Sequence, residues 1–314
     1  MQRNSKTLKI GILGRSNLPH EIVQRMEKRG MLKITGIHGT KNPEVYRKIA
    51  DFDDFLIEPE AVFISDLSWS DFATVAGLVK HSKHVYLENP CLFSNGEIRK
   101  VELLAAEAGV VVQLGLKHRY QSTYRVIRDF DLKPRIIECN RFLKFSENTT
   151  SISVISDLMM HDIDVVLTLA GSPVKSINAT GVGVLYDDPD VVNARIEFYN
   201  GCIANLAASK ISGKNVHKTR FFQNNSYYAV NFLDQSVSML KNGSDNEEFV
   251  LNGTETQKPA QNADSCDIFA VELETFYRCI IDKTSPEASV ADFLNTKIVA
   301  DRIIDQLERN FKRK

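Results

Sequence analysis

Short apolar runs alternate with amphipathic stretches along the first part of the chain. Strand-like runs lie at Leu8 to Leu13, Leu32 to His38, Ala61 to Ser65, Val85 to Leu87 and Val110 to Leu114. Helical patterns lie between them, at Glu21 to Arg29, Pro43 to Asp51, Asp71 to Lys80 and Asn95 to Ala108. Strands separated by helices of this length predict parallel crossovers. An uninterrupted apolar run such as Val110-Val111-Val112 is expected where both faces of a parallel sheet are covered.

The pattern changes after about residue 120, where strands follow one another with short turns. We predict strands at Pro134 to Phe145, Val174 to Leu185, Val191 to Tyr199, Cys202 to Ala208, Arg220 to Phe222 and Ser226 to Phe232. Asn200-Gly201 is a hairpin signal between two of them, and a helix from Leu158 to Ala170 stops at Gly171-Ser172-Pro173. Residues 241–265 are polar and predict a surface excursion, followed by closing helices at Ile268 to Ile281 and Ala291 to Arg309.

These patterns predict an α/β protein with two domains. Residues 1–120 are expected to form a doubly wound parallel sheet of the Rossmann type. Residues 121–314 are expected to form an α+β domain with an open, mostly antiparallel sheet and the C-terminal closing helices. The length of 314 residues agrees with about two domains.

Composition disfavours nucleic-acid-binding, membrane-spanning and zinc-binding proteins. The net charge of −1 offers no electrostatic footprint for nucleic acid or an anionic membrane. No apolar run approaches the roughly 20 residues that span a bilayer. The five cysteines are scattered and never spaced as Cys-x-x-Cys, which favours reduced thiols in the cytoplasm and disfavours a zinc site.

The turn after the first strand is a candidate nucleotide site. A dinucleotide fingerprint needs glycines where the backbone approaches a pyrophosphate at a helix N-terminus. Gly14 is in place, but Ser16 and Pro19 stand at the later glycine positions. A plain strand–turn–helix therefore remains an alternative to a dinucleotide site.

Two further strand ends carry polar residues that a cofactor could contact. Thr40 and Lys41 follow the second strand, where an acid usually reads the adenine ribose. Without that acid, Lys41 and Arg15 could pair with a 2′-phosphate, although a polar turn is an equal alternative. The fourth strand ends at Glu88-Asn89-Pro90, because Pro90 has no N–H to continue a ladder.

The segment from Asp157 to Asp164 is the main candidate for proton chemistry. On a helix, Asp157, His161 and Asp164 lie on one face. A carboxylate four residues before a histidine can orient the ring and stabilise its charged form, as a general base requires. The alternatives are an Asp157 helix cap with a satisfied, partly buried His161, or a metal site.

The chain resembles the Gfo/Idh/MocA family, the glucose–fructose oxidoreductase and inositol dehydrogenase group. Lys83-His84-Val85 through Glu88-Asn89-Pro90 is similar to its Gly-Lys-His-Val…Glu-Lys-Pro signature, and Asp157, His161 and Asp164 match its Asp-x-x-x-His-x-x-Asp motif. His118-Arg119-Tyr120 resembles the segment that opens the family's second domain. One departure is consequential, because Asn89 stands where the family has a usually catalytic lysine.

The resemblance implies an NAD(P)-dependent dehydrogenase acting on a hydroxyl-bearing carbon of a sugar or sugar nucleotide. It also implies a homodimer or homotetramer packed through the second sheet. His161, Asp157 and Asn89 are the expected catalytic residues, with Lys117 and Asp164 on the substrate. The expected cofactor contacts are Gly14, Arg15, Ser16, Asn17, Thr40, Lys41, Ser65 and Glu88, and we expect NADP slightly ahead of NAD. Two rival hypotheses are a cofactor- or sugar-binding homologue without turnover, and a partner-binding protein with an empty cleft.

Overall fold

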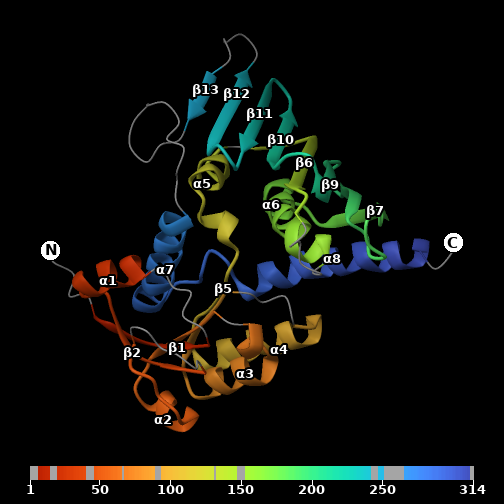
Figure 1. Cartoon of the computed structure of the whole chain (residues 1–314). Coiled ribbons are helices and arrows are strands. Elements are labelled where there is room, and N and C mark those ends of the chain that lie inside the picture. Colours follow the sequence, from red (N-terminus) through yellow and green to blue (C-terminus); the bar gives the residue numbers. More distant parts are fainter. Residues whose placement is uncertain are drawn as a thin grey trace. The chain divides into compact units, whose positions relative to one another are not determined.

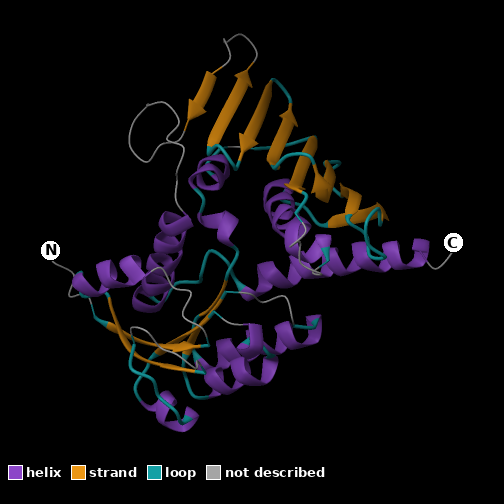
Figure 2. Cartoon of the chain, viewed as in Figure 1, coloured by secondary structure: helices purple, strands orange, loops and turns teal. Residues whose placement is uncertain are grey.

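A computed structural model of the chain describes residues 6–14, 20–39, 46–65, 67–88, 93–130, 132–146, 153–241, 247–250 and 265–311. The chain divides into two compact units. Unit 1 comprises Met1–Tyr120 and Asp264–Leu294, and unit 2 comprises Gln121–Ala263 and Asn295–Lys314. Figure 1 labels the elements along the chain, and Figure 2 distinguishes helices from strands.

Unit 1 is built on a five-stranded sheet with the order β2-β1-β3-β4-β5, in which every pairing is parallel. Its strands are β1 (Leu8–Leu13), β2 (Leu32–His38), β3 (Ala61–Ile64), β4 (His84–Leu87) and β5 (Val112–Leu114). Its helices are α1 (His20–Lys28), α2 (Phe52–Ile57), α3 (Phe72–Lys80), α4 (Asn95–Ala108) and α7 (Ser265–Asp282), with short turns η1 (Leu67–Trp69) and η2 (Lys117–Tyr120). The predicted doubly wound parallel sheet is confirmed.

The core of unit 1 explains why α7 belongs to it. Phe63 and Tyr86 stack on neighbouring strands, with ring centroids 4.2 Å apart. Phe269 and Phe276 of α7 pack edge-on against these two rings. Figure 1 shows α1 and α7 on one side of the sheet and α3 and α4 on the other. This aromatic packing accounts for the place of residues 264–294 in unit 1, whereas the predicted second domain spans residues 121–314.

Unit 2 contains an eight-stranded sheet with the order β13-β12-β11-β10-β6-β9-β8-β7. The β6–β9 pairing is parallel and the others are antiparallel, as the predicted open, mostly antiparallel sheet requires. The strands are β6 (Ile136–Lys144), β7 (Val174–Val182), β8 (Val191–Phe198), β9 (Ile203–Ser212), β10 (Val216–Gln223), β11 (Ser226–Asn231), β12 (Ser236–Lys241) and β13 (Glu247–Val250). The helical elements are α5 (Ser122–Arg128), the π-helical turn η3 (Ile155–Met159), α6 (Met160–Ala170) and most of α8 (Val290–Phe311).

Two glycines set the boundaries of elements in unit 2. Gly171 ends α6 with φ 58°, and Gly201 turns the β8–β9 hairpin with φ 84°. Both values lie in the left-handed region, which glycine adopts without steric cost. The predicted helix stop and hairpin are therefore confirmed.

Local expectations failed at several places, and strand β12 was not predicted. The helix predicted over 43–51 is wrong for residues 46–51, because Asp51 instead caps α2 by accepting hydrogen bonds from the N–H groups of Asp53 and Asp54. Helix α5 was not predicted. Strand β13 lies inside the predicted excursion at 241–265, where pairing with β12 overrides the polar composition.

Candidate active site

The carboxyl ends of the parallel strands bring several predicted cofactor residues to one edge of unit 1. Gly14 follows β1 with φ 98°, a value that favours glycine. Its N–H donates to the carbonyl of His38, at the end of β2, over 2.9 Å. Ser65 is buried directly after β3. The first strand-to-helix turn thus has the glycine that a nucleotide-binding turn needs.

An ion pair lies at the end of β4. Lys117 Nζ lies 2.7 Å from Glu88 Oε1, and the two side chains are 53% and 20% exposed. Gly115 lets the chain after β5 pass close to the backbone of Glu88, because a Cβ there would clash with the carbonyl oxygen of Glu88. A negative and a positive group are therefore held together at the edge where open α/β sheets bind ligands.

Aromatic rings enclose the end of β2. Trp69 stacks on Phe52 with centroids 6.3 Å apart and an interplanar angle of 10°. It also lies against Gly39, where an added Cβ would meet the indole nitrogen at 2.5 Å. This packing gives Trp69 a structural role in holding the turn after β2.

Several predicted site residues lie outside the described residues. They are Arg15, Ser16, Asn17, Thr40, Lys41 and Asn89. Their roles stay predictions.

A buried polar cluster, which sequence reasoning missed, lies on one face of the same sheet. Glu272 of α7 is fully buried, and burial raises the pKa of its carboxyl group to about 7. The hydroxyls of Tyr86 and Tyr120 are buried near it, and Gln113 donates to the backbone carbonyl of Glu272 over 3.1 Å. The signal was present in the sequence, since Glu272 interrupts the apolar face that Phe269 begins.

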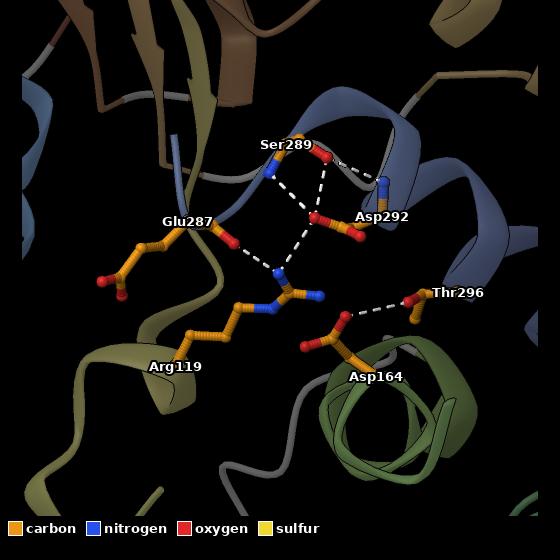
Figure 3. Close-up of polar contacts among 6 residues, drawn as sticks. All are labelled: Arg119, Asp164, Glu287, Ser289, Asp292 and Thr296. Carbon is orange, nitrogen blue, oxygen red and sulfur yellow. Dashed lines mark hydrogen bonds and ion pairs between the residues drawn. The ribbon is translucent and has the colours of Figure 1, made fainter. Parts of the chain in front are cut away.

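Arg119 connects the two segments of unit 1, Met1–Tyr120 and Asp264–Leu294. Its guanidinium donates to the carbonyl oxygen of Glu287 and, over 3.0 Å, to the carboxylate of Asp292 (Figure 3). That carboxylate also accepts from Ser289 Oγ at 2.7 Å, while Ser289 Oγ accepts from the N–H of Asp292 at 3.1 Å. The resemblance implied that this segment opens the second domain, whereas Tyr120 closes the first stretch of unit 1.

The predicted catalytic segment of unit 2 begins in a π-helical turn. Residues Ile155–Met159 have π geometry before α6 starts at Met160. π-helical turns are rare in proteins, and those that do occur are frequently found at functional sites. The carboxylate of Asp157 lies in this turn, 3.0 Å from Nζ of Lys210, a lysine on β9 that is only 5% exposed. Asp157 therefore compensates a buried lysine, a partner that its helical spacing did not predict.

The other two residues of the predicted motif differ in their exposure. His161 is partly exposed on the first turn of α6. Asp164 is buried and accepts a hydrogen bond from Thr296 of α8 over 3.2 Å (Figure 3). A second buried pair joins Asp162 to His217 at 3.1 Å. Asp162 and Asp164 are buried, whereas His161 is partly exposed, so His161 stays the candidate for proton transfer in this segment.

Two kinds of feature are absent from the described residues. No group of three or more His, Cys, Asp and Glu side chains there could hold a metal ion. None of the described helices has the length and apolar character to cross a bilayer.

Comparisons with known proteins agree with this architecture. Residues 123–223 match the family described as the GFO/IDH/MocA C-terminal domain. The chain is 28% identical over 240 residues to UDP-N-acetylglucosamine 3-dehydrogenase from Acidithiobacillus ferrooxidans, covering 74% of each protein. It is 22% identical over 233 residues to the uncharacterized oxidoreductase YrbE of Bacillus subtilis, covering 66% of this chain and 68% of that protein.

Solved structures show the same fold. The Acidithiobacillus ferrooxidans enzyme superposes with a TM-score of 0.84 at 23% identity, covering 97% of this chain and 99% of that one. A levoglucosan dehydrogenase in complex with NADH and levoglucosan superposes with a TM-score of 0.82 at 14% identity, covering 97% and 98%. Residues 123–223 are therefore similar to the GFO/IDH/MocA C-terminal domain, and the chain as a whole shares the fold of these solved structures.

Proposed function

We propose that this protein is an NAD(P)-dependent oxidoreductase that moves a hydride to or from a hydroxyl-bearing carbon of a sugar or sugar nucleotide. The observation that carries the proposal is the polar edge of unit 1, where Gly14, Ser65 and the Glu88–Lys117 pair follow parallel strands. Nucleotides bind at the carboxyl ends of such strands. The relatives named as UDP-N-acetylglucosamine 3-dehydrogenase and as levoglucosan dehydrogenase with NADH support the same class.

The described residues fit a dinucleotide. Gly14 has the backbone conformation that favours glycine, and Gly115 keeps the end of β5 close to Glu88. When bound, the nicotinamide supplies the carbon that accepts or donates the hydride. In this proposal the turn after β1 holds the pyrophosphate and the turn after β2 holds the adenosine ribose, while Ser65 and Glu88 hold the nicotinamide half. The residues assigned to the first two turns are Gly14, Arg15, Ser16, Asn17, Thr40 and Lys41.

We propose that His161 takes the hydroxyl proton during oxidation and returns it during reduction, since imidazole changes charge between about pH 5 and 8. Lys117, held by Glu88, directs its ammonium group toward a substrate oxygen. Asn89 can orient a hydroxyl with its amide N–H groups but offers no charge. We therefore expect slow turnover, lower by roughly 10²–10³ than with a charged stabiliser.

The two aspartates of the motif take supporting roles in this proposal. Asp157 shares its charge with Lys210 and acts on the His161 ring through its electrostatic field. Asp164 is engaged by Thr296, so we assign it to fixing α6 in place of the substrate contact expected from the motif.

The proposal also covers the cofactor preference, the oligomeric state and the cellular location of the protein. NADP(H) should bind more tightly than NAD(H), because Thr40 and Lys41 present no carboxylate that would repel a 2′-phosphate. We propose a homodimer or homotetramer that packs through the second sheet. We place the protein in the cytoplasm, since Cys139, Cys202 and Cys279 are buried free thiols.

Two measurements test the function. Fluorescence titration with NADPH and NADH should give saturable binding, and a screen of sugars and sugar nucleotides should give turnover that His161→Ala abolishes. Asn89→Lys should preserve or raise that turnover. Full activity of His161→Ala would show that another group moves the proton.

A non-catalytic binder is the second candidate, favoured by Asn89 at the position of the family's lysine. It predicts cofactor or sugar binding without turnover of any substrate, including in Asn89→Lys. If neither dinucleotide nor sugar binds, the remaining explanation is a partner-binding protein.

A further inference from the structure

Glu272 occupies a core position of α7. Its neighbours on the same helix face, Phe269, Leu273 and Phe276, are all buried apolar residues that pack on the sheet of unit 1. A carboxylate at such a position has lost its hydration, and an unpaired buried charge is strongly disfavoured. The side chain therefore keeps its proton at a pH where an exposed glutamate is ionised.

Several buried polar atoms around Glu272 lack a hydrogen bond of standard geometry among the described residues. They are both carboxyl oxygens of Glu272, the hydroxyls of Tyr86 and Tyr120, and Oε1 of Gln113. The side-chain interaction between Tyr86 and Glu272 nevertheless acts on the pKa values of both groups. Such groups in a native protein need an explanation, which is frequently a functional one. Here they form one cluster, because Glu272 acts electrostatically on both tyrosines.

The cluster is coupled to the ligand edge of the same unit. Tyr86 lies on β4 two residues before Glu88, which directly follows the end of the strand. The charges of Lys117 and Glu88 both act on the Glu272 carboxyl group, in opposite directions. A charge on Glu272 would in turn act on a group bound beside Glu88, with little screening because Glu272 is fully buried.

Three buried ionisable neighbours of Glu272 stay neutral. Burial raises the pKa values of Tyr86, Tyr120 and Cys279, which keeps all three neutral near pH 7. Arg119 is held by Asp292. Among the described residues, the charged and titratable groups around the cluster are Tyr86 on β4, Glu88 after it, Lys117, Arg119 and Tyr120 of η2, Cys279 of α7, Glu287 before α8 and Asp292 in its first turn.

We propose that the proton on Glu272 sets the redox preference of the cofactor edge: loss of the proton favours the oxidised nicotinamide, whose ring is positively charged, over the neutral reduced ring. The inference rests on the proposed function, because it requires a nicotinamide beside Glu88. A unit charge about 10 Å away at an effective dielectric constant of about 20 changes binding by roughly tenfold.

The test measures dissociation constants of oxidised and reduced cofactor between pH 5.5 and 8.5. In the native protein the ratio of the reduced-form to the oxidised-form constant should rise roughly tenfold across neutral pH. In Glu272→Gln, which keeps the shape and removes the charge, the ratio should not change. Glu274→Gln is the matched control, since Glu274 is on the same helix but exposed and paired with Arg278. It should behave as the native protein does.

Calorimetry in buffers of different ionisation enthalpy gives an independent measure. Linkage requires that the oxidised cofactor, which favours the ionised form, release protons from Glu272 when it binds near pH 7. The reduced cofactor should release fewer, and Glu272→Gln should abolish the difference. If Glu272→Gln does not fold, the native protein's ratio and proton release still decide the question.

The outcomes separate the two proposals. Absence of binding of either cofactor form at every pH would overturn the proposed function and this inference with it. Cofactor binding with a ratio that is independent of pH, or that changes equally in Glu272→Gln, would overturn this inference and leave the proposed function intact.

Discussion

Replacing Glu272 by glutamine should change how the stability of unit 1 depends on pH. The pKa of Glu272 rises from its ordinary 4.5 to about 7 because burial penalises the carboxylate. Between these values the folded protein holds a proton that the unfolded chain has released. Stability from this group is therefore fully present below about pH 4.5 and is lost as the pH rises through 7.

The magnitude follows from the size of the shift. Each pKa unit corresponds to about 1.4 kcal/mol, so ionisation of Glu272 costs unit 1 about 3 kcal/mol by pH 8. Glutamine has no charge to bury. We expect Glu272→Gln to match the native protein within about 1 kcal/mol at pH 5 and to be more stable by about 3 kcal/mol at pH 8.

Urea unfolding followed by tryptophan fluorescence measures this effect. Trp69 is the one tryptophan of the sequence and lies in unit 1, so its emission reports on the unit that contains Glu272. Glu274→Gln controls for a changed charge on the same helix. Parallel stability curves for the native protein and Glu272→Gln from pH 5 to 8 would refute the reasoning.

Three further predictions concern single contacts. Gly115→Ala should lower the free energy of unfolding by roughly 1–3 kcal/mol, because the new methyl group meets the carbonyl of Glu88; a thermal melt with an unchanged midpoint would contradict this. Asp157→Asn should destabilise by roughly 1–3 kcal/mol, because the buried ammonium group of Lys210 loses this carboxylate. Addition of Lys210→Met should recover most of that loss, and purely additive effects would show that the pair is not coupled. Thr40→Asp should reverse the preference for NADP over NAD in a binding titration, and an unchanged ratio would exclude this residue from ribose recognition.

Sequence patterns were sufficient for the architecture. The alternation of apolar runs and amphipathic helices identified the five parallel strands, and Asn200-Gly201 located a hairpin between two antiparallel strands. These features depend on neighbours within a few residues, so a local pattern contains the information. Motif order was sufficient for the resemblance to the family whose C-terminal domain residues 123–223 match, because a motif compares residue types at fixed spacings.

The partners of individual side chains were decided by the tertiary structure. Spacing along a helix suggested that Asp157 serves His161, yet its carboxylate lies 3.0 Å from Nζ of Lys210, a residue brought in by β9. The sequence pattern predicted a closing helix at Ile268 to Ile281 and gave no special role to Glu272. Packing of α7 on the sheet of unit 1 buries this residue. Burial and long-range pairing depend on contacts between segments far apart in the chain. Local periodicity therefore predicts which elements form, while only the folded protein determines which charges lie in water and which lie in the core.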